Sequence, residues 1–145
     1  WQEAAPLAVR RNHHTAAAHE GRIYVCGGRD ESTFRQTASE VFDPASGQWQ
    51  TIASLPTGRS GIASAVLNGV IVVFGGESSG PLGRTFDDAE AYDPATDSWT
   101  VLPPMPIARH GLGAASVGGA MHVISGGPRP GFTYSDVNQV LTYTP

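Results

Sequence analysis

The stretch VFDPASGQW at residues 41–49 returns as AYDPATDSW at residues 91–99, fifty residues further along the chain. Both copies place an aromatic residue before Asp-Pro and end on tryptophan. Proline presets its own φ, and an aspartate side chain accepts hydrogen bonds from backbone N–H groups that follow it, so each copy predicts a tight turn. A turn of this kind at a fixed spacing indicates a repeat protein.

Four markers share this period. They are tryptophan at Trp1, Trp49 and Trp99; arginine at Arg11, Arg59 and Arg109; a Gly-Gly pair after RIYVC, VIVVF and MHVIS; and an aromatic residue two positions before proline at Phe42, Tyr92 and Tyr143. One extra residue near Gly118-Gly119 interrupts the spacing in the last copy. The markers predict three repeats, at about 1–49, 50–99 and 100–145.

Each repeat divides into four strand-sized segments bounded by turn residues. In the middle repeat these are GIASAVLN, VIVVFGG, DDAEAYDP and SWTVLP. Small residues in the first segment suit a strand crowded around a central axis, and the continuously apolar second segment suits a strand covered on both faces. The tryptophan then fills the widening gap between outer strands. This pattern predicts an all-β fold built from propeller blades.

The combined markers resemble the kelch repeat over essentially all 145 residues. Phe42, Thr144 and Ser125 depart from the usual pattern. The resemblance implies a kelch-type β-propeller with three four-stranded blades per chain, which is half of a six-bladed ring.

Three blades do not close a ring, because propellers have about 4 to 8. We expect a second copy of the chain to complete it, with the N-terminal Trp1 segment supplying strand four of the closing blade. One alternative is that the sequence is part of a longer chain, cut inside the turn at residues 143–145. Another is an engineered or excerpted half-propeller that assembles without a retained function.

The composition narrows the choice of partner. With 40% hydrophobic and 15% charged residues, the chain has the balance of a folded domain. Its nine basic residues are all arginine and its formal charge is −4, so nucleic acid is not an expected partner. No apolar run approaches the length of a membrane span, and Cys26 has no second cysteine to pair with. Nothing in the sequence indicates a cellular compartment.

The arginines are expected to collect on one face of the propeller. The connections between strands two and three, at about 29–38, 77–89 and 128–136, emerge on the same side as those between strand four and the next blade. Eight arginines fall on these connections: Arg10, Arg11, Arg29, Arg35, Arg59, Arg84, Arg109 and Arg129. Their field would attract an acidic protein segment or a small anionic ligand. The alternative is that neighbouring carboxylates such as Asp30 and Glu77 pair with them.

The resemblance to kelch domains that bind acidic peptides implies ligand contacts at the repeated arginines and the residues after them. These candidate ligand-binding residues are Arg11, Asn12, Arg59, Ser60, Arg109 and His110. Considered alone, the three arginines can instead tie blades together by donating to backbone carbonyls.

The preferred function is a non-catalytic recognition module. The alternative is a sugar-processing enzyme resembling the kelch sialic-acid mutarotases, in which the arginines hold a sugar carboxylate and His110 or a loop acid moves a proton.

No metal site, cofactor or catalytic motif is expected. His13 and His14 are adjacent on a strand and so point to opposite faces. Cys26 and Tyr134 lack the pattern implied by similarity to copper-radical galactose oxidases.

Overall fold

The structure, a computed structural model, describes residues 1–78 and 82–144, and it contains eleven strands in three antiparallel sheets. Each sheet is one blade. Blade 1 comprises β1 (Thr15–His19), β2 (Arg22–Cys26), β3 (Ser39–Asp43) and β4 (Gln48–Thr51). Blade 2 comprises β5 (Ala63–Leu67), β6 (Val70–Phe74), β7 (Ala89–Asp93) and β8 (Ser98–Leu102). Blade 3 comprises β9 (Gly113–Val117), β10 (Ala120–Ile124) and β11 (Asn138–Leu141).

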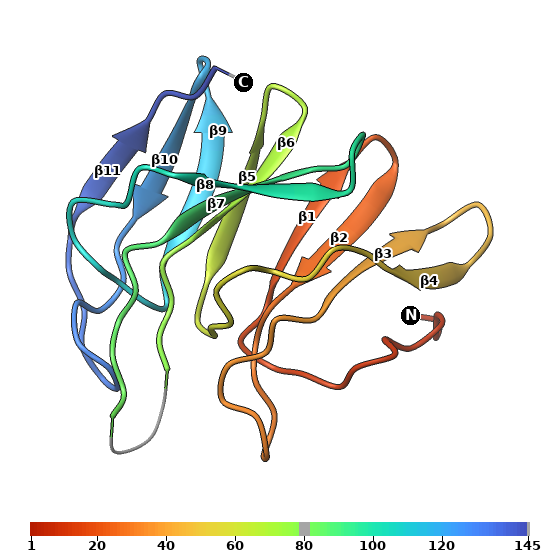
Figure 1. Cartoon of the computed structure of the whole chain (residues 1–145), viewed down its shortest axis with the longest axis horizontal. Coiled ribbons are helices and arrows are strands. Elements are labelled where there is room, and N and C mark those ends of the chain that lie inside the picture. The colour runs from red at the N-terminus through yellow and green to blue at the C-terminus, as the bar shows by residue number, and fades with distance from the viewer. Residues whose placement is uncertain (79–81, 145) are drawn as a thin grey trace.

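The blades form an open fan (Figure 1). The first strand of each blade is innermost: β1 contacts β5, and β5 contacts β9. The N-terminal segment lies beside β4 at one side of the fan, and β11 forms the edge at the other. The predicted all-β arrangement of propeller blades is confirmed, with the difference that blade 3 has three strands among the described residues.

The predicted Asp-Pro turns are present between the third and fourth strands. The Oδ1 atom of Asp43 accepts from the N–H of Ala45 at 2.8 Å, and that of Asp93 accepts from the N–H of Ala95 at 2.8 Å. Because both aspartates satisfy the backbone in the same way, the repeated motif sets the turn geometry in blades 1 and 2.

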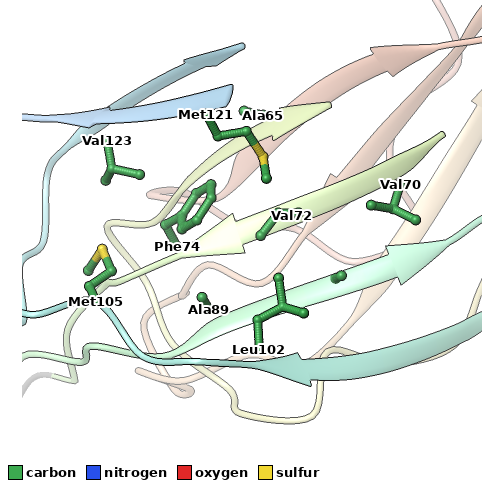
Figure 2. Packing of buried hydrophobic residues seen from close by; sticks show 10 residues of the cluster. Ala65, Val70, Val72, Phe74, Ala89, Leu102, Met105, Met121 and Val123 are labelled. Atoms are coloured by element: carbon green, nitrogen blue, oxygen red, sulfur yellow. The ribbon is translucent and has the colours of Figure 1, made fainter. Parts of the chain in front are cut away.

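Two cores lie between the blades. The core between blades 2 and 3 contains Val72, Phe74, Leu102, Met121 and Val123 (Figure 2). The Met121 and Val123 side chains come from blade 3 and pack toward the sheet of blade 2. Between blades 1 and 2, one buried cluster is Tyr24, Val41, Ile71 and Tyr92, and a second is Cys26, Leu55, Ile62 and Val73.

Trp49 and Trp99 each bind the segment that leads into their own blade. The Trp99 ring packs beside the core between blades 1 and 2, and its Nε1–H donates to the Ala53 carbonyl at 2.8 Å. Trp49 likewise donates to the carbonyl of Ala5, at 2.8 Å. Each tryptophan therefore closes a gap against the connection that enters its own blade.

The strand register corrects the glycine alignment in the third repeat. Ser125 occupies the left-handed position that Gly27 and Gly75 occupy in the other blades, with φ of 61° against 62° and 59°. The predicted extra residue near Gly118-Gly119 is therefore absent, and this hairpin has the same length as the one at residues 68–69. The mismatch arose because a serine had taken the place of the first glycine.

The aromatic marker of the third repeat is also displaced. Leu141 pairs with Met121 as Tyr92 pairs with Ile71. Leu141, rather than Tyr143, thus occupies the aromatic position of blade 3. The proline of this marker, Pro145, lies outside the described residues.

Candidate functional site

The connections divide the molecule into two faces. We call the loop face the side formed by residues 9–14, 52–62 and 103–112, together with the described parts of the long connections 27–38, 75–88 and 125–137. We call the hairpin face the opposite side, formed by the short turns at 20–21, 44–47, 68–69, 94–97 and 118–119. All eight arginines predicted to share a face are on the first set of connections, and Arg22 begins β2 at the hairpin face.

The repeated arginines lie inside the blades, beneath the loop face. Arg59 is fully buried, and its guanidinium donates to the carbonyls of Thr57, Val73 and Gly75 and to the Glu90 carboxylate. Arg11 repeats the arrangement in blade 1, with Glu40 Oε2 at 2.5 Å and the Gly27 carbonyl at 3.1 Å. Each arginine thereby neutralises a buried carboxylate and ties its connection to its own blade.

Arg109 differs from the other two. It donates to the carbonyls of Val123 and Ser125, but its side-chain acceptor is Gln139 Oε1, at 2.8 Å, where blades 1 and 2 supply a glutamate. Its Nε–H has no partner among the described residues. Desolvation lowers the pKa of this guanidinium. Blade 3 therefore holds a buried cation without a matching carboxylate.

These positions bear directly on the predicted ligand-binding residues. Arg59, Ser60 and Arg109 are fully buried, and the Arg11 side chain is also inaccessible. Their acceptors include backbone carbonyls, as in the alternative role, but each arginine bonds within its own blade and does not join one blade to the next. Asn12 is exposed and His110 is half-buried. Of the six candidates, Asn12 is exposed at the surface of the loop face, whereas 11% of the His110 side chain is exposed.

Sequence reasoning missed a polar cluster where the three blades meet, although the alternative that Glu77 pairs with a loop arginine holds for Arg29. We call His13, Arg29, Glu77 and His110 the inner-rim cluster. Glu77 is its centre: Oε1 lies 3.2 Å from Arg29 Nη1, and Oε2 lies 3.6 Å from His110 Nδ1. The N–H of Gly131 in blade 3 also donates to Oε2, at 3.2 Å. One carboxylate thus connects blades 1, 2 and 3.

His13 has a strained backbone. Its φ is 53°, whereas the matching residues of the next blades are Gly61 and Gly111, with φ of 65° and 60°. The left-handed region disfavours residues that carry a Cβ, by about 1–2 kcal/mol. The signal was visible in the sequence, as RNH against RSG and RHG. A histidine kept where glycine fits better indicates a role for the imidazole.

The imidazole of His13 is held in its neutral form. Its Nδ1–H donates to Asn12 Oδ1 at 2.7 Å, and Nε2 accepts from Arg29 Nη2 at 3.0 Å. Desolvation, and then the charge of Arg29, lower the pKa of His13, while Glu77 opposes them. The ring therefore presents a fixed tautomer at the inner rim.

A groove lies beside this cluster on blade 1. Its volume is about 480 Å³, and its lining includes Arg10, Asn12, Arg29, Glu31 and Ser32. Asp30 also lines it, but the carboxylate accepts from the N–H groups of Ser32 and Thr33, and these bonds lower its pKa. The lining thus combines three arginines, Arg11 among them, with the carboxylates of Asp30 and Glu31 and with polar side chains.

Four other arginines of the loop face are open to solvent. Arg10, Arg35, Arg84 and Arg129 are exposed, and the Arg84 guanidinium lies 4.4 Å from the centre of the Phe86 ring. His110 Nε2–H donates to the Arg129 carbonyl at 3.0 Å. This bond holds the connection at residues 125–137 against the inner-rim cluster.

Metal and thiol chemistry find no support in the part of the chain that the structure describes. No group of three His, Cys, Asp or Glu residues is arranged to hold an ion there. Burial raises the pKa of the Cys26 thiol to about 11, which leaves it protonated near neutral pH. The described residues also include no helix with the length and apolar character needed to span a bilayer.

Comparison with known proteins settles the family. The model of the KLHDC2/KLHL20/DRC7 Kelch-repeats domain matches residues 2–142. The chain belongs to the kelch-repeat family. Its propeller is thus of the kind found among protein-interaction modules.

The relatives of this kelch chain are longer proteins. Alpha-scruin of Limulus polyphemus is 38% identical over 76 residues, which cover 52% of this chain and 8% of alpha-scruin. Kelch-like protein 15 of Danio rerio is 35% identical over 82 residues, 52% of this chain and 14% of that protein. The solved structure of YjhT matches with a TM-score of 0.74 and 27% identity, over 85% of this chain and 36% of YjhT. The kelch chain therefore spans a minor part of each.

Proposed function

We propose that this chain is a non-catalytic recognition module that binds an acidic segment of a partner protein on its loop face. The carrying observation is His13, which holds a left-handed backbone where the other blades have glycine and bonds to Arg29 in the inner-rim cluster. The fold alone does not require that side chain. Strain kept at a surface position beside a polar groove supports a binding role.

Charge supports the class of ligand. Arg10 and Arg29 line the groove, and Arg129 is exposed on the neighbouring blade 3. Guanidinium groups bind carboxylates in paired, charge-assisted hydrogen bonds. Asn12 and His110 are the predicted site residues that we expect to contact the ligand. Arg11, Arg59, Arg109 and Ser60 lie behind them and act by supporting the loops.

Binding of an acidic peptide tests this proposal. A peptide of alternating Asp and Glu should lose roughly tenfold or more in affinity to Arg10→Ala, because one charge-assisted hydrogen bond contributes about 1.5–3 kcal/mol. Arg22→Ala is the matched control, since Arg22 lies on the hairpin face. Equal losses in both variants, or no binding by the parent chain, would refute the proposal.

We also propose that a second copy completes the ring, giving six blades from two chains of three. The flank of blade 3 supports this. Val117, Ile124 and Val140 are 65%, 45% and 56% exposed, although their counterparts in blade 2, Leu67, Phe74 and Ala91, pack against blade 3. A flank of this kind is stable against another blade and a liability in water.

The inner rim supports the same closure. The N–H of Gly61 donates to the His13 carbonyl at 2.8 Å, and the N–H of Gly111 donates to the Gly61 carbonyl at 2.8 Å. The two ends of this ladder are the His13 N–H, a donor, and the Gly111 carbonyl, an acceptor. In a two-copy ring, the donor of one chain can bond to the acceptor of the other. Sedimentation should give twice the 15.2 kDa mass of one chain. A monomer at high protein concentration would contradict two-copy closure.

None of the contacts made by the described residues favours the sugar-processing alternative. His110 is held between Glu77 and the Arg129 carbonyl, and the repeated arginines are buried.

A further inference from the structure

The outer edge of blade 3 is unpaired. β3 and β7 each lie between two strands, whereas β11 pairs with β10 and with no other strand among the described residues. Beside this edge lies a largely apolar cavity of about 220 Å³, lined by Phe74, Pro103, Met105, Val123 and Leu141, among others. An open strand edge next to an apolar cavity suits an added strand that carries a large apolar side chain.

Blades 1 and 2 show which side chain fills the matching position. Trp49 donates to the Ala5 carbonyl and Trp99 to the Ala53 carbonyl, both at 2.8 Å. Ala5 and Ala53 each stand six positions before a repeated arginine, and Pro103 stands six before Arg109. The Pro103 carbonyl at the cavity is therefore the acceptor expected for a third tryptophan.

The N-terminal segment has the required sequence and is held in a suitable place. Trp1-Gln2 repeats the Trp49-Gln50 pair of β4. Ala5 is bound by Trp49, and the Ala8 N–H donates to Glu40 Oε1 at 2.9 Å, so the segment is anchored on blade 1. The Trp1 side chain is fully exposed.

We propose that the β11 edge and its cavity bind residues 1–4 of a second copy of the chain, with Trp1 filling the cavity and donating from Nε1 to the Pro103 carbonyl. This inference rests on the proposed two-copy ring and names the residues that close it. By the two-fold relation, each chain gives its segment to the other.

The register follows from the complete blades. Trp49 pairs with Phe42, and Trp99 pairs with Tyr92. Leu141 holds the corresponding place on β11, so Trp1 lies opposite it. The next pairs are then Gln2 with Val140 and Glu3 with Gln139.

This register also supplies a missing charge. Arg109 lacks the glutamate that accompanies Arg11 and Arg59, and its acceptor is Gln139. With Glu3 of the second copy directly opposite Gln139, the two Cβ atoms are separated by about 4.5–5.5 Å. A carboxylate then lies near the uncompensated guanidinium. The charge pattern therefore favours this chain's own segment as the occupant.

A disulfide tests the register. Gln2 and Val140 are both exposed, so Gln2→Cys and Val140→Cys leave the cores intact. Directly opposite residues of an antiparallel pair lie within disulfide range. Mild oxidation of the double variant should convert most of the protein to a cross-linked dimer, and mass spectrometry should find a peptide pair joined through the two introduced cysteines. The control pairs Gln2→Cys with Val117→Cys, on β9, which should give no such link.

The outcomes separate this inference from the proposed ring. A dimer by sedimentation in which the two introduced cysteines do not cross-link overturns the strand exchange and leaves the ring standing. A monomer overturns both. In the uncross-linked chain, Trp1→Ala should weaken dimerisation at least tenfold, since a buried tryptophan anchor is a typical hot spot. The control is Phe132→Ala, which removes an exposed aromatic side chain from the loop face and should leave dimerisation unchanged. If Trp1→Ala and Phe132→Ala change the dimerisation constant equally, the inference is overturned.

Discussion

The loop face and the hairpin face belong to the same three blades and contain hollows of similar size, about 480 and 520 Å³. The hollow on the hairpin face is lined largely by turn residues, such as Glu20, Asn68 and Gly69, whose conformations reverse the chain. The groove on the loop face is lined by side chains that the turns do not need, Arg10 and Arg29 among them. Volume therefore does not separate a binding face from a structural one, whereas side chains that the turn geometry does not require do.

The largest difference between the faces should appear in stability. Arg59→Ala removes a buried ion pair with Glu90 and leaves the carboxylate uncompensated, so we expect a loss of about 3–5 kcal/mol in the free energy of unfolding. Arg22→Ala breaks an exposed pair with Asp43 and should cost less than about 1 kcal/mol. Urea denaturation measures both. Similar losses would show that the interior arginines do not support the loop face.

A smaller gain is expected at the third arginine. Gln139→Glu restores the carboxylate that Glu40 and Glu90 provide, and it should stabilise the chain by about 1.5–3 kcal/mol, as for hydrogen bonds to charged groups. Gln139→Ala, which removes the acceptor from Arg109, should destabilise it. Both are measured by thermal unfolding at neutral pH. A less stable Gln139→Glu variant would mean that Arg109 is already neutralised in another way.

These arginines show how far sequence reasoning reached. Because the repeat spacing fixes the blades and aligns one arginine in each, the fold and the position of all three were predictable. Their burial was not, since it depends on Glu40, Glu90 and Gln139, which approach from β3, β7 and β11 only after folding. Ser125 was misaligned for a related reason: its left-handed backbone is visible only in the structure.

The inner-rim cluster was missed because its members come from separate connections. Arg29, Glu77 and His110 are far apart in sequence and carry no shared motif. His13 was noticed only as part of a histidine pair. Comparing it with Gly61 and Gly111 would have revealed the unusual residue, although not its contact with Arg29.

Relieving backbone strain should stabilise the chain on either face but should weaken peptide binding on the loop face alone. His13→Gly should raise the free energy of unfolding by about 1 kcal/mol, and it should weaken binding of the acidic peptide. Glu20→Gly is the matched control, because Glu20 is exposed on the hairpin face with φ of 47°. It should give a similar gain in unfolding and unchanged peptide affinity. If both variants bind the peptide as the parent chain does, His13 has no role in recognition.

The smallest effect concerns pH. The pKa of His13 is lowered in the folded state, so the unfolded chain binds more protons as the pH falls below 6.5, and stability decreases in that range. His14, whose pKa is lowered chiefly by desolvation, acts in the same direction. Replacing His13 with Gln should flatten, but not abolish, the decline in unfolding midpoint between about pH 6.5 and 5. If the unfolding midpoint of the variant declines with pH as steeply as that of the parent chain, groups other than His13 account for the decline.

The most direct test of the central claim is a map of amide chemical shifts as an acidic peptide is added. We expect the largest changes on the loop face, at the N–H groups of Asn12, His13, Ser32 and His110. Changes centred on the hairpin face, at Glu20, Asn68 and Ala95, would contradict the account.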